Sequence, residues 1–412
     1  MKRIPGLVVL FAAVAGAGLV VLAQSTGPAA GLTPRQELGK KLFFDTRLST
    51  PAGQSCAACH APSVGWTGPD EAVNKAGAVY EGSVSDRHGN RKPPASGYAG
   101  ESPTLRRLEN GTFVGGMFWD GRATGETLGD PLAEQALGPF LNPLEQNNAD
   151  AKAVVEKVKS SDYAALFEKV WGPGSLDLAN VKATYEKIGR SIAAFERSAE
   201  VEPFSSKFDD FWRQARAKGL DPVKIDGSNA SRYAGLGLDD KELKGLTLFA
   251  TKGMCASCHS LASIDRRPPV FTDFTYDNIG VPKNPKNPFY AMPAAYNPDG
   301  KAWVDKGLGE TLKGITKYAQ FADANMGKHK VPTLRNVDKR PSPGFVKAYM
   351  HNGYFQSLRD IVKFYNTRDR AGAKWPAPES PANVNTKEMG KLGLTPEEEG
   401  LIVLFLGTLT DR

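Results

Sequence analysis

The chain has 412 residues, of which 41% are hydrophobic and 24% are charged, and its formal net charge is +7 at pH 7. This length is sufficient for two domains with hydrophobic cores of their own. The basic residues are scattered and do not form blocks, which argues against nucleic acid as a partner and indicates only a mild attraction for acidic partners.

Residues 1–23 have the features of a secretory signal peptide. Lys2 and Arg3 precede an uncharged apolar run over residues 6–23, which ends in a small residue suited to cleavage. The run is close to the lower length limit for crossing a bilayer, so an uncleaved membrane anchor is the alternative. In both cases the sequence predicts that the globular part lies outside the cytoplasm, in the periplasm, and that it meets a membrane only if this segment is retained.

The chain repeats one pattern in its two halves. Residues 32–37 and 238–242 each look like the start of a helix. Thr33 in the first segment and Asp239 or Asp240 in the second are suited to the N-cap, and Pro34 stands at the first helical position. Each of these starts leads into a similar segment, at residues 39–44 and 245–249. We therefore expect an amphipathic helix at the start of each half.

Helical patterns also dominate the rest of the chain. Apolar residues at intervals of three and four predict helices over residues 150–171 and 180–200, whereas the alternation typical of strands is scarce. The stretch over residues 225–237 is rich in Gly, Ser and Asn, as linkers are. The sequence thus predicts an all-α, loop-rich protein of two cytochrome c-like domains, over residues 32–224 and 238–412.

Two copies of the motif Cys-x-x-Cys-His follow the repeated segments, at residues 56–60 and 255–259. Two thiols at this spacing can each form a thioether bond with a vinyl group of haem, and the adjacent histidine then binds the iron as its proximal ligand. A zinc site or a disulfide would not require a histidine directly after each cysteine pair. The sequence therefore predicts two covalently bound haems c, one in each unit. The predicted attachment and ligand residues are Cys56, Cys59, His60, Cys255, Cys258 and His259.

Five further elements occur in a definite order, at residues 118–123, 134–136, 138–145, 331–337 and 349–353. Together with the two haem motifs they resemble the bacterial di-haem cytochrome c peroxidase and MauG superfamily, and the match covers nearly the whole mature chain. The resemblance implies an oxidoreductase that acts on hydrogen peroxide. It also implies a protein electron donor or a protein substrate in the periplasm.

The resemblance assigns roles around the first haem. In the family a glutamate above the open side of the iron moves a proton between the two oxygens of peroxide, and Glu145 holds its position. Gln135 and Pro139 match family residues ten and six positions before this glutamate. Trp119 matches the tryptophan that bridges the two haems. The alternatives are an exposed loop glutamate and a tryptophan that only packs in the core.

The position fourteen residues after His351 distinguishes the branches of the family. Ordinary peroxidases have there a methionine that binds the second haem, whereas MauG-like enzymes have a tyrosine, and this chain has Tyr365. A thioether favours ferrous iron, while a phenolate is a hard anionic donor that favours ferric and higher states. The alternative is that Tyr365 is a core residue and that Met350 or Met326 is the ligand.

Three further residues have two interpretations each. His88 lies in a loop after the first haem motif and is either an ordinary loop residue or a cap on the first iron. Arg122 and Arg335 have the planar guanidinium that suits haem propionates, or else they form salt bridges between the domains.

The family also places a calcium ion between the haems. An asparagine side chain and two backbone carbonyls bind it, and the corresponding residues here are Asn90, Val346 and Ala348. Val346 and Ala348 replace a threonine and a proline of the family, but carbonyl ligation does not require particular side chains. The resemblance therefore implies Ca²⁺ as a further cofactor.

These features predict a periplasmic di-haem enzyme that uses hydrogen peroxide to form a high-valent di-haem state and oxidises a protein substrate, as MauG-like enzymes do. The first alternative is a peroxidase that reduces hydrogen peroxide to water with electrons from a small cytochrome c or cupredoxin. The second is a non-catalytic di-haem electron carrier, which would need no proton shuttle at Glu145. One departure separates the chain from MauG itself, because Gly253 stands where MauG has the tryptophan that relays oxidation to its substrate.

Overall fold

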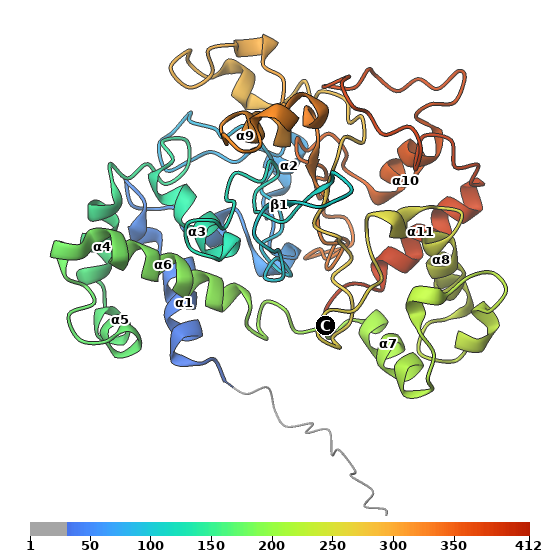
Figure 1. Cartoon of the computed structure of the whole chain (residues 1–412), viewed down its shortest axis with the longest axis horizontal. Coiled ribbons are helices and arrows are strands. Elements are labelled where there is room, and N and C mark those ends of the chain that lie inside the picture. Colours follow the sequence, from blue (N-terminus) through green and yellow to red (C-terminus); the bar gives the residue numbers. More distant parts are fainter. Residues whose placement is uncertain (1–30) are drawn as a thin grey trace, which may run out of the picture. The chain divides into compact units, whose positions relative to one another are not determined.

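Helices and loops make up almost all of the chain that the computed structural model describes, residues 31–412 (Figure 1). The α-helices of this part are α1 (Pro34–Phe44), α2 (Glu71–Lys75), α3 (Pro131–Leu141), α4 (Ala151–Lys159), α5 (Ala164–Trp171), α6 (Val181–Glu196), α7 (Lys207–Ala217), α8 (Asp240–Ala250), α9 (Leu308–Lys313), α10 (Leu358–Thr367) and α11 (Pro396–Gly407). The prediction of an all-α, loop-rich fold is confirmed. The predicted signal peptide lies outside the described residues, and none of the described helices has the length and apolar character needed to cross a membrane.

Extended structure is limited to two short antiparallel pairs in the described part of the chain. Strand β1 (Arg106–Arg107) pairs with β2 (Phe113–Val114), and β3 (Tyr276–Asp277) pairs with β4 (His329–Lys330). The second pair joins loops from distant parts of the sequence, and these loops lie beside the second haem motif. The strands therefore serve to position loops and do not form a sheet with a core of its own.

The helices that precede the haem motifs form as predicted. Thr33 accepts a hydrogen bond from the Gln36 backbone N–H, and the Gln36 side chain accepts one from Thr33 N–H, which completes a capping box at the start of α1. Asp239 and Glu242 form the same reciprocal cap at the start of α8. These caps are set by residues three apart in the sequence, so local spacing was enough to predict them.

Each of these helices crosses a later helix at a glycine. Gly39 of α1 lies against the Ser191 carbonyl of α6, and a Cβ atom there would come within 1.9 Å of the oxygen. Gly245 of α8 lies in the same way against the Leu401 carbonyl of α11, where the distance would be 2.1 Å. The repeat seen in the sequence is thus a repeated close helix crossing, and it fixes the loop that holds each haem motif.

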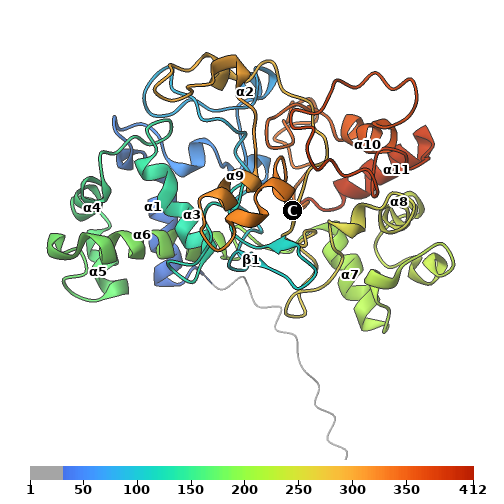
Figure 2. The ribbon, with the colours of Figure 1, turned by 45° about the horizontal axis from the view of Figure 1, so that its top comes forward.

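The two largest hydrophobic cores belong to different parts of the chain. One is built from residues between 38 and 201 and the other from residues between 208 and 409. Figures 1 and 2 show α1 and α3 to α6 together on one side and α7, α8, α10 and α11 on the other. Contacts join both groups into one unit over residues 32–412, and the domain boundaries at residues 224 and 238 stay predictions.

One helix prediction is corrected. The segment over residues 150–171 is not one helix but two, α4 and α5, which are separated by a turn at residues 160–163. The Ser161 hydroxyl donates to the Val158 carbonyl in this turn, and serine side chains compete in this way with the hydrogen bonds of a helix.

Candidate functional site: two cavities at the haem motifs

A cavity lies beside each Cys-x-x-Cys-His motif. The first has a volume of about 410 Å³ and the second about 190 Å³. Each motif begins in a single 3₁₀ turn, over Cys56–Ala58 and Cys255–Ser257, which brings the two cysteines of the motif to the cavity wall. The residues that the sequence assigned to haem attachment all line these cavities, Cys56, Cys59 and His60 the first and Cys255, Cys258 and His259 the second.

The motif histidines are held in the form that a metal ion needs. His60 Nδ1 lies 3.3 Å from the Trp66 carbonyl oxygen, and His259 Nδ1 lies 2.9 Å from the Phe271 carbonyl oxygen. Because a carbonyl only accepts, Nδ1 carries the proton and Nε2 keeps a free lone pair. Burial lowers the pKa of His60 to about 4 and also lowers the pKa of His259, so both rings are neutral. The residues present therefore fit one covalent haem in each cavity.

The first cavity brings together the residues expected to act on peroxide. Gln135 and Pro139 lie four residues apart on α3 and therefore share one helix face, and both line the cavity. Glu145 lines it from the turn that follows α3, where its backbone N–H donates to the Asn142 carbonyl. Burial raises the pKa of Glu145, and the charge of Arg122 opposes this rise in part. The side chain is thus a carboxyl group that gives up its proton less readily than usual.

A second carboxyl group in this cavity was not predicted. Glu196 lies at the end of α6, is only 3% exposed and lines the first cavity. Its Oε2 atom has no hydrogen-bond partner among the described residues, and burial raises the pKa of Glu196 to about 8. The sequence contained a signal for it, because a glutamate at this position interrupts the apolar face of the helix.

The two arginines assigned to haem propionates lie in different surroundings. Arg122 lines the first cavity, stacks on the Phe118 ring at 3.7 Å and lies 3.0 Å from Asp120. Arg335 lines neither haem cavity, and its fully buried guanidinium lies 2.8 Å from the Asp209 carboxylate on α7. Arg335 thus forms a buried salt bridge, but its partner lies on α7, which packs in the second hydrophobic core, so the predicted salt bridge between domains is not what this contact favours.

His88 does not line the first cavity, although the neighbouring Gly89 does. Its backbone N–H lies 3.4 Å from Met292 Sδ, and its main chain forms a bridge with Glu81. These contacts favour the interpretation of His88 as a loop residue.

Trp119 lines both cavities and is 8% exposed. Its indole N–H donates to the Lys92 carbonyl at 2.8 Å, and its ring meets the His351 ring edge to face at 6.5 Å. Trp119 thus belongs to the walls of both cavities, and its role as a bridge between two haems stays a prediction.

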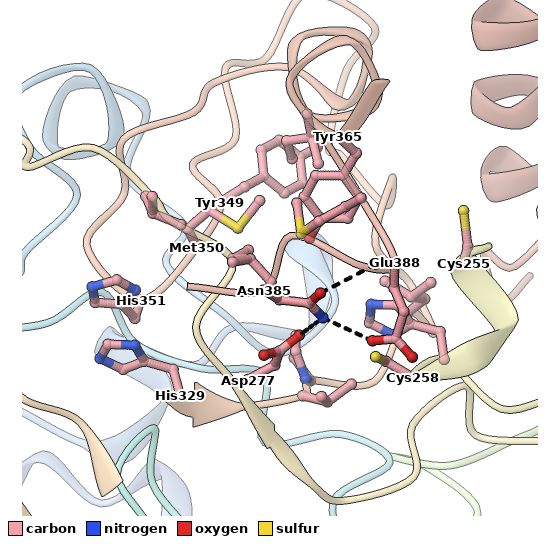
Figure 3. Close-up of a pocket in the computed structure, with 18 of the residues that line it drawn as sticks. Cys255, Cys258, Asp277, His329, Tyr349, Met350, His351, Tyr365, Asn385 and Glu388 are labelled. Carbon is pink, nitrogen blue, oxygen red and sulfur yellow. Dashed lines mark hydrogen bonds between the residues drawn. The ribbon is translucent and has the colours of Figure 1, made fainter. Parts of the chain in front are cut away.

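Tyr365 projects from α10 into the second cavity, whose wall also includes Met350 and Met389 (Figure 3). Burial raises the pKa of Tyr365 well above its ordinary value, so the free side chain is a neutral phenol. Met326 does not line this cavity and packs instead in a small core near α9. Tyr365 and Met350 thus both remain as candidates for the second ligand of the iron.

Two stacked histidines form an unpredicted feature at one end of the second cavity. The His329 and His351 rings are 3.6 Å apart and inclined by 8° (Figure 3). His329 Nε2 lies 3.2 Å from Asp305, and His351 Nε2 lies 3.5 Å from Glu379. Neither Nε2 atom has a hydrogen bond of good geometry among the described residues, and both lie beside carboxylates.

A buried arginine connects this histidine pair to the first cavity. Arg91 Nε lies 2.6 Å from Asp305, and Arg91 Nη1 lies 2.5 Å from Asp120, which lines the first cavity with Arg91. The charge of Arg91 lowers the pKa of both aspartates, against the effect of burial. The residues come from loops far apart in the chain, and no local pattern pointed to their contact.

The residues predicted to bind calcium lie in two loops. Asn90 lines the first cavity, and its carbonyl accepts a hydrogen bond from the Asn287 amide. The Val346 carbonyl accepts one from the Asn74 amide at 3.1 Å, and Ala348 is buried. Calcium binding at these residues stays a prediction.

Comparison with known proteins gives a consistent result. The family described as di-haem cytochrome c peroxidase matches residues 33–217. Methylamine utilization protein MauG of Paracoccus denitrificans is 34% identical over 96% of this chain and 94% of its own length. Cytochrome-c peroxidase IdrP2 of Denitromonas iodatirespirans is 26% identical over 92% of this chain and 83% of its own. The crystal structure of the diheme peroxidase BthA from Burkholderia thailandensis superposes with a TM-score of 0.72 at 30% identity, over 93% of this chain and 90% of that one.

Proposed function

Because the chain belongs to the di-haem cytochrome c peroxidase and MauG family, we propose that it is a MauG-like enzyme, which uses hydrogen peroxide to oxidise a protein substrate in the periplasm. Membership of this family confirms the resemblance seen in the sequence. It identifies the protein as an enzyme that acts on peroxide and carries two covalent haems. The observation that carries the choice of branch is Tyr365 in the wall of the second cavity, beside Cys258 and His259. The signal-like segment at residues 1–23 supports the periplasmic location.

The haems, when bound, supply the iron that reacts with peroxide and holds the oxidising equivalents. In the first cavity His60 would hold the iron. Glu145 would take a proton from one peroxide oxygen and give it to the other, which then leaves as water. Its raised pKa suits this role, because a carboxyl group that is protonated more easily than usual can both accept and release a proton. Gln135 would orient the peroxide by hydrogen bonding.

In the second cavity His259 and Tyr365 would hold the iron. Burial makes the unbound phenol hard to ionise, so Tyr365 would become a phenolate only where a metal cation balances its charge. Such a donor stabilises oxidised iron. Trp119, which lines both cavities, would then conduct electrons between the two sites.

An ordinary peroxidase is the second candidate, and one observation favours it. Met350 lines the same cavity as Tyr365, so a thioether ligand for the second iron is within the geometry of the site. A tyrosinate ligand gives the haem iron a low reduction potential, which would suit the storage of oxidising equivalents. A thioether ligand gives it a higher potential, which would suit the entry of electrons from a small donor protein.

Two ligand variants distinguish the candidates. Tyr365→Phe keeps the ring and removes only the oxygen, whereas Met350→Leu keeps the apolar volume and removes only the sulfur. If Tyr365 is the ligand, the first variant alone should change the magnetic circular dichroism of the second haem in the ferric holoenzyme. A change in the Met350→Leu protein alone would instead indicate an ordinary peroxidase.

The reaction with peroxide gives an independent test. The fully ferric wild-type enzyme should react with hydrogen peroxide in a stopped-flow experiment without any electron donor, and the absorbance of both haems should change together. An enzyme that is inert until one haem is reduced would contradict the MauG-like assignment and support the ordinary peroxidase.

A further inference from the structure

A row of aromatic rings leads from the second cavity to the outside of the protein. Tyr365 lines the cavity, and the neighbouring ring on α10, that of Phe364, lies 6.2 Å from it between centroids. The Trp375 indole meets the Phe364 ring edge to face at 5.2 Å. Phe364 is fully buried, whereas Trp375 is half-buried and directly follows the exposed stretch over residues 370–374. The row therefore passes from the cavity to the surface in two ring contacts.

The position of the Trp375 ring is fixed from two sides. Its indole N–H lies 3.0 Å from Thr367 Oγ1. The Thr367 hydroxyl donates its own proton to the Lys363 carbonyl at 2.6 Å, so its oxygen can only accept from the indole. The Phe355 ring lies 5.9 Å from the indole and 5.1 Å from the Phe364 ring. The indole is thus held against Phe364.

An indole in this position can exchange electrons as well as cover the core. Among aromatic side chains it gives up an electron most readily, and the Trp375 N–H can keep its proton beside Thr367 while the ring is oxidised. The Phe364 ring is not itself oxidised, but it fills the gap between Trp375 and Tyr365 through which an electron would pass. Packing alone would be served by a large apolar side chain without a polar atom that needs a partner.

The surface around Trp375 has exposed basic side chains. Lys363 lies one helical turn before Thr367, with which Trp375 forms its hydrogen bond. Arg370 follows in a turn, where its backbone N–H donates to the Thr367 carbonyl at 3.1 Å, and Lys374 directly precedes Trp375. The three basic side chains are exposed, and none of them forms a salt bridge in the described part of the chain.

Acidic side chains of the same segment do not cancel this charge. Residues 357–375 include five basic and two acidic residues. Asp369 is paired with Arg368 at 2.6 Å, and Asp360 accepts a hydrogen bond from the Ser357 hydroxyl at the start of α10. A surface with an excess of positive charge attracts an acidic face of another protein, and such attraction speeds the brief encounters of electron-transfer partners.

We propose that Trp375 is the point at which electrons cross between the second haem site and a protein partner, and that the exposed basic residues around it dock an acidic face of that partner. The inference rests on the proposed function, from which it takes a second site that peroxide oxidises. Trp375 gives one electron through Phe364 toward Tyr365 and regains one from the partner. Two such transfers supply the two electrons that, with two protons from the partner or from water, reduce one hydrogen peroxide to two waters.

Variants at Trp375 separate electron transfer from packing. Trp375→Phe and Trp375→Tyr both place one aromatic ring at the site, but of the two only tyrosine is readily oxidised. The holoprotein is first oxidised with peroxide and then mixed with reduced cytochrome b5, an acidic one-electron donor protein, in a stopped-flow experiment. Trp375→Phe should lose most of the wild-type rate of this second step, and Trp375→Tyr should keep more of it. Both variants should keep the wild-type rate of the first step and the magnetic circular dichroism of the second haem.

Trp171→Phe is the matched control. Trp171 is also half-buried, and its indole N–H donates to a hydroxyl, that of Ser191, at 3.0 Å. It packs against the first hydrophobic core and lines neither cavity, so this variant should react with cytochrome b5 as the wild-type protein does. Equal rates in Trp375→Phe and Trp171→Phe would overturn the role of Trp375. Equal losses in Trp375→Phe and Trp375→Tyr would also overturn it, because they would show that the residue only packs.

Charge variants test the docking surface, and they decide the matter if the Trp375 variants do not fold. Lys363→Gln/Lys374→Gln removes two exposed charges beside Trp375, and Lys159→Gln/Lys169→Gln removes two exposed charges on α4 and α5. The first pair should slow the reaction with cytochrome b5 by about tenfold at low ionic strength and much less at high salt, whereas the second pair should not. Equal effects of the two pairs would overturn the proposed surface.

A measurement without any partner separates this inference from the proposed function. Repeated additions of peroxide should add oxygen to Trp375, because an indole that has lost two electrons combines with water. Peptide mass spectrometry should find this product at Trp375 and not at Trp171, and its absence from a protein that reacts with peroxide would count against the electron path. A ferric enzyme that is inert to peroxide would contradict the proposed function alone, and the same tests would then start from enzyme reduced by one electron with ascorbate.

Discussion

Glu196 is a buried carboxyl group, and its replacement by glutamine should stabilise the folded protein by an amount that depends on pH. The side chain is 3% exposed and its Oε2 atom has no hydrogen-bond partner among the described residues. Burial raises the pKa of Glu196 from an ordinary value of 4.5 to about 8. The folded state therefore binds a proton that the unfolded chain releases in the neutral range.

The sign and the size of the effect follow from this shift. Because the folded-state pKa is raised, the folded state binds more protons between pH 4.5 and 8, and its stability relative to the unfolded state falls as pH rises through that range. Each pH unit costs about 1.4 kcal/mol, so the cost is about 3 kcal/mol at pH 7 and below about 1 kcal/mol at pH 5. Glutamine cannot ionise, so Glu196→Gln avoids this cost.

Guanidinium unfolding of the holoprotein, followed by circular dichroism at pH 5 and pH 7, measures the difference. Glu196→Gln should exceed the wild-type protein in free energy of unfolding by about 3 kcal/mol at pH 7 and by much less at pH 5. Glu156→Gln is the control, since Glu156 is exposed and should give no such pH dependence. A gain of equal size at both pH values would show that Glu196 is not held protonated by burial.

Three further predictions concern the reaction. Glu145→Gln removes the titrating group, and stopped-flow mixing with peroxide should show a reaction slower by about 10²–10⁴-fold with both haem spectra unchanged; an unaltered rate would refute its role as a proton shuttle. Trp119→Phe should keep the peroxide reaction at the first haem and slow the later change at the second, as dual-wavelength recording would show. His88→Ala should leave the rate of the ferric enzyme unchanged, whereas a faster reaction would indicate that His88 caps the iron.

The parts of the fold that could be predicted are those fixed by neighbouring residues. The capping boxes at Thr33 and Asp239 depend on residues three apart, and both helices begin where these caps indicate. The break between α4 and α5 was missed because the apolar period continues through it. A serine that bonds back to the preceding turn ends α4 without interrupting that period.

The same distinction applies to the site. Gln135, Pro139 and Glu145 lie within one helix and the turn after it, so the spacing in the sequence places them in one cavity. The contact of Arg91 with Asp305 joins loops more than two hundred residues apart, and only the tertiary fold brings them together. Glu196 lies between these two cases. Its place on the apolar face of a helix can be seen in the sequence, whereas the cavity beside it is formed only by the tertiary fold.

The two cavities differ in the chemistry that their side chains allow. The first contains two carboxyl groups with raised pKa values, Glu145 and Glu196, so protons can be taken up and released there. The wall of the second haem cavity has the thioethers of Met254, Met350 and Met389 and the phenols of Tyr349 and Tyr365, together with carboxyl groups such as Asp277. Under the proposed function, Glu145 would move the proton of peroxide in the first cavity, Tyr365 would stabilise oxidised iron in the second, and Trp119 lies in the wall of both. An electron carrier would need neither the proton-transfer groups nor this asymmetry.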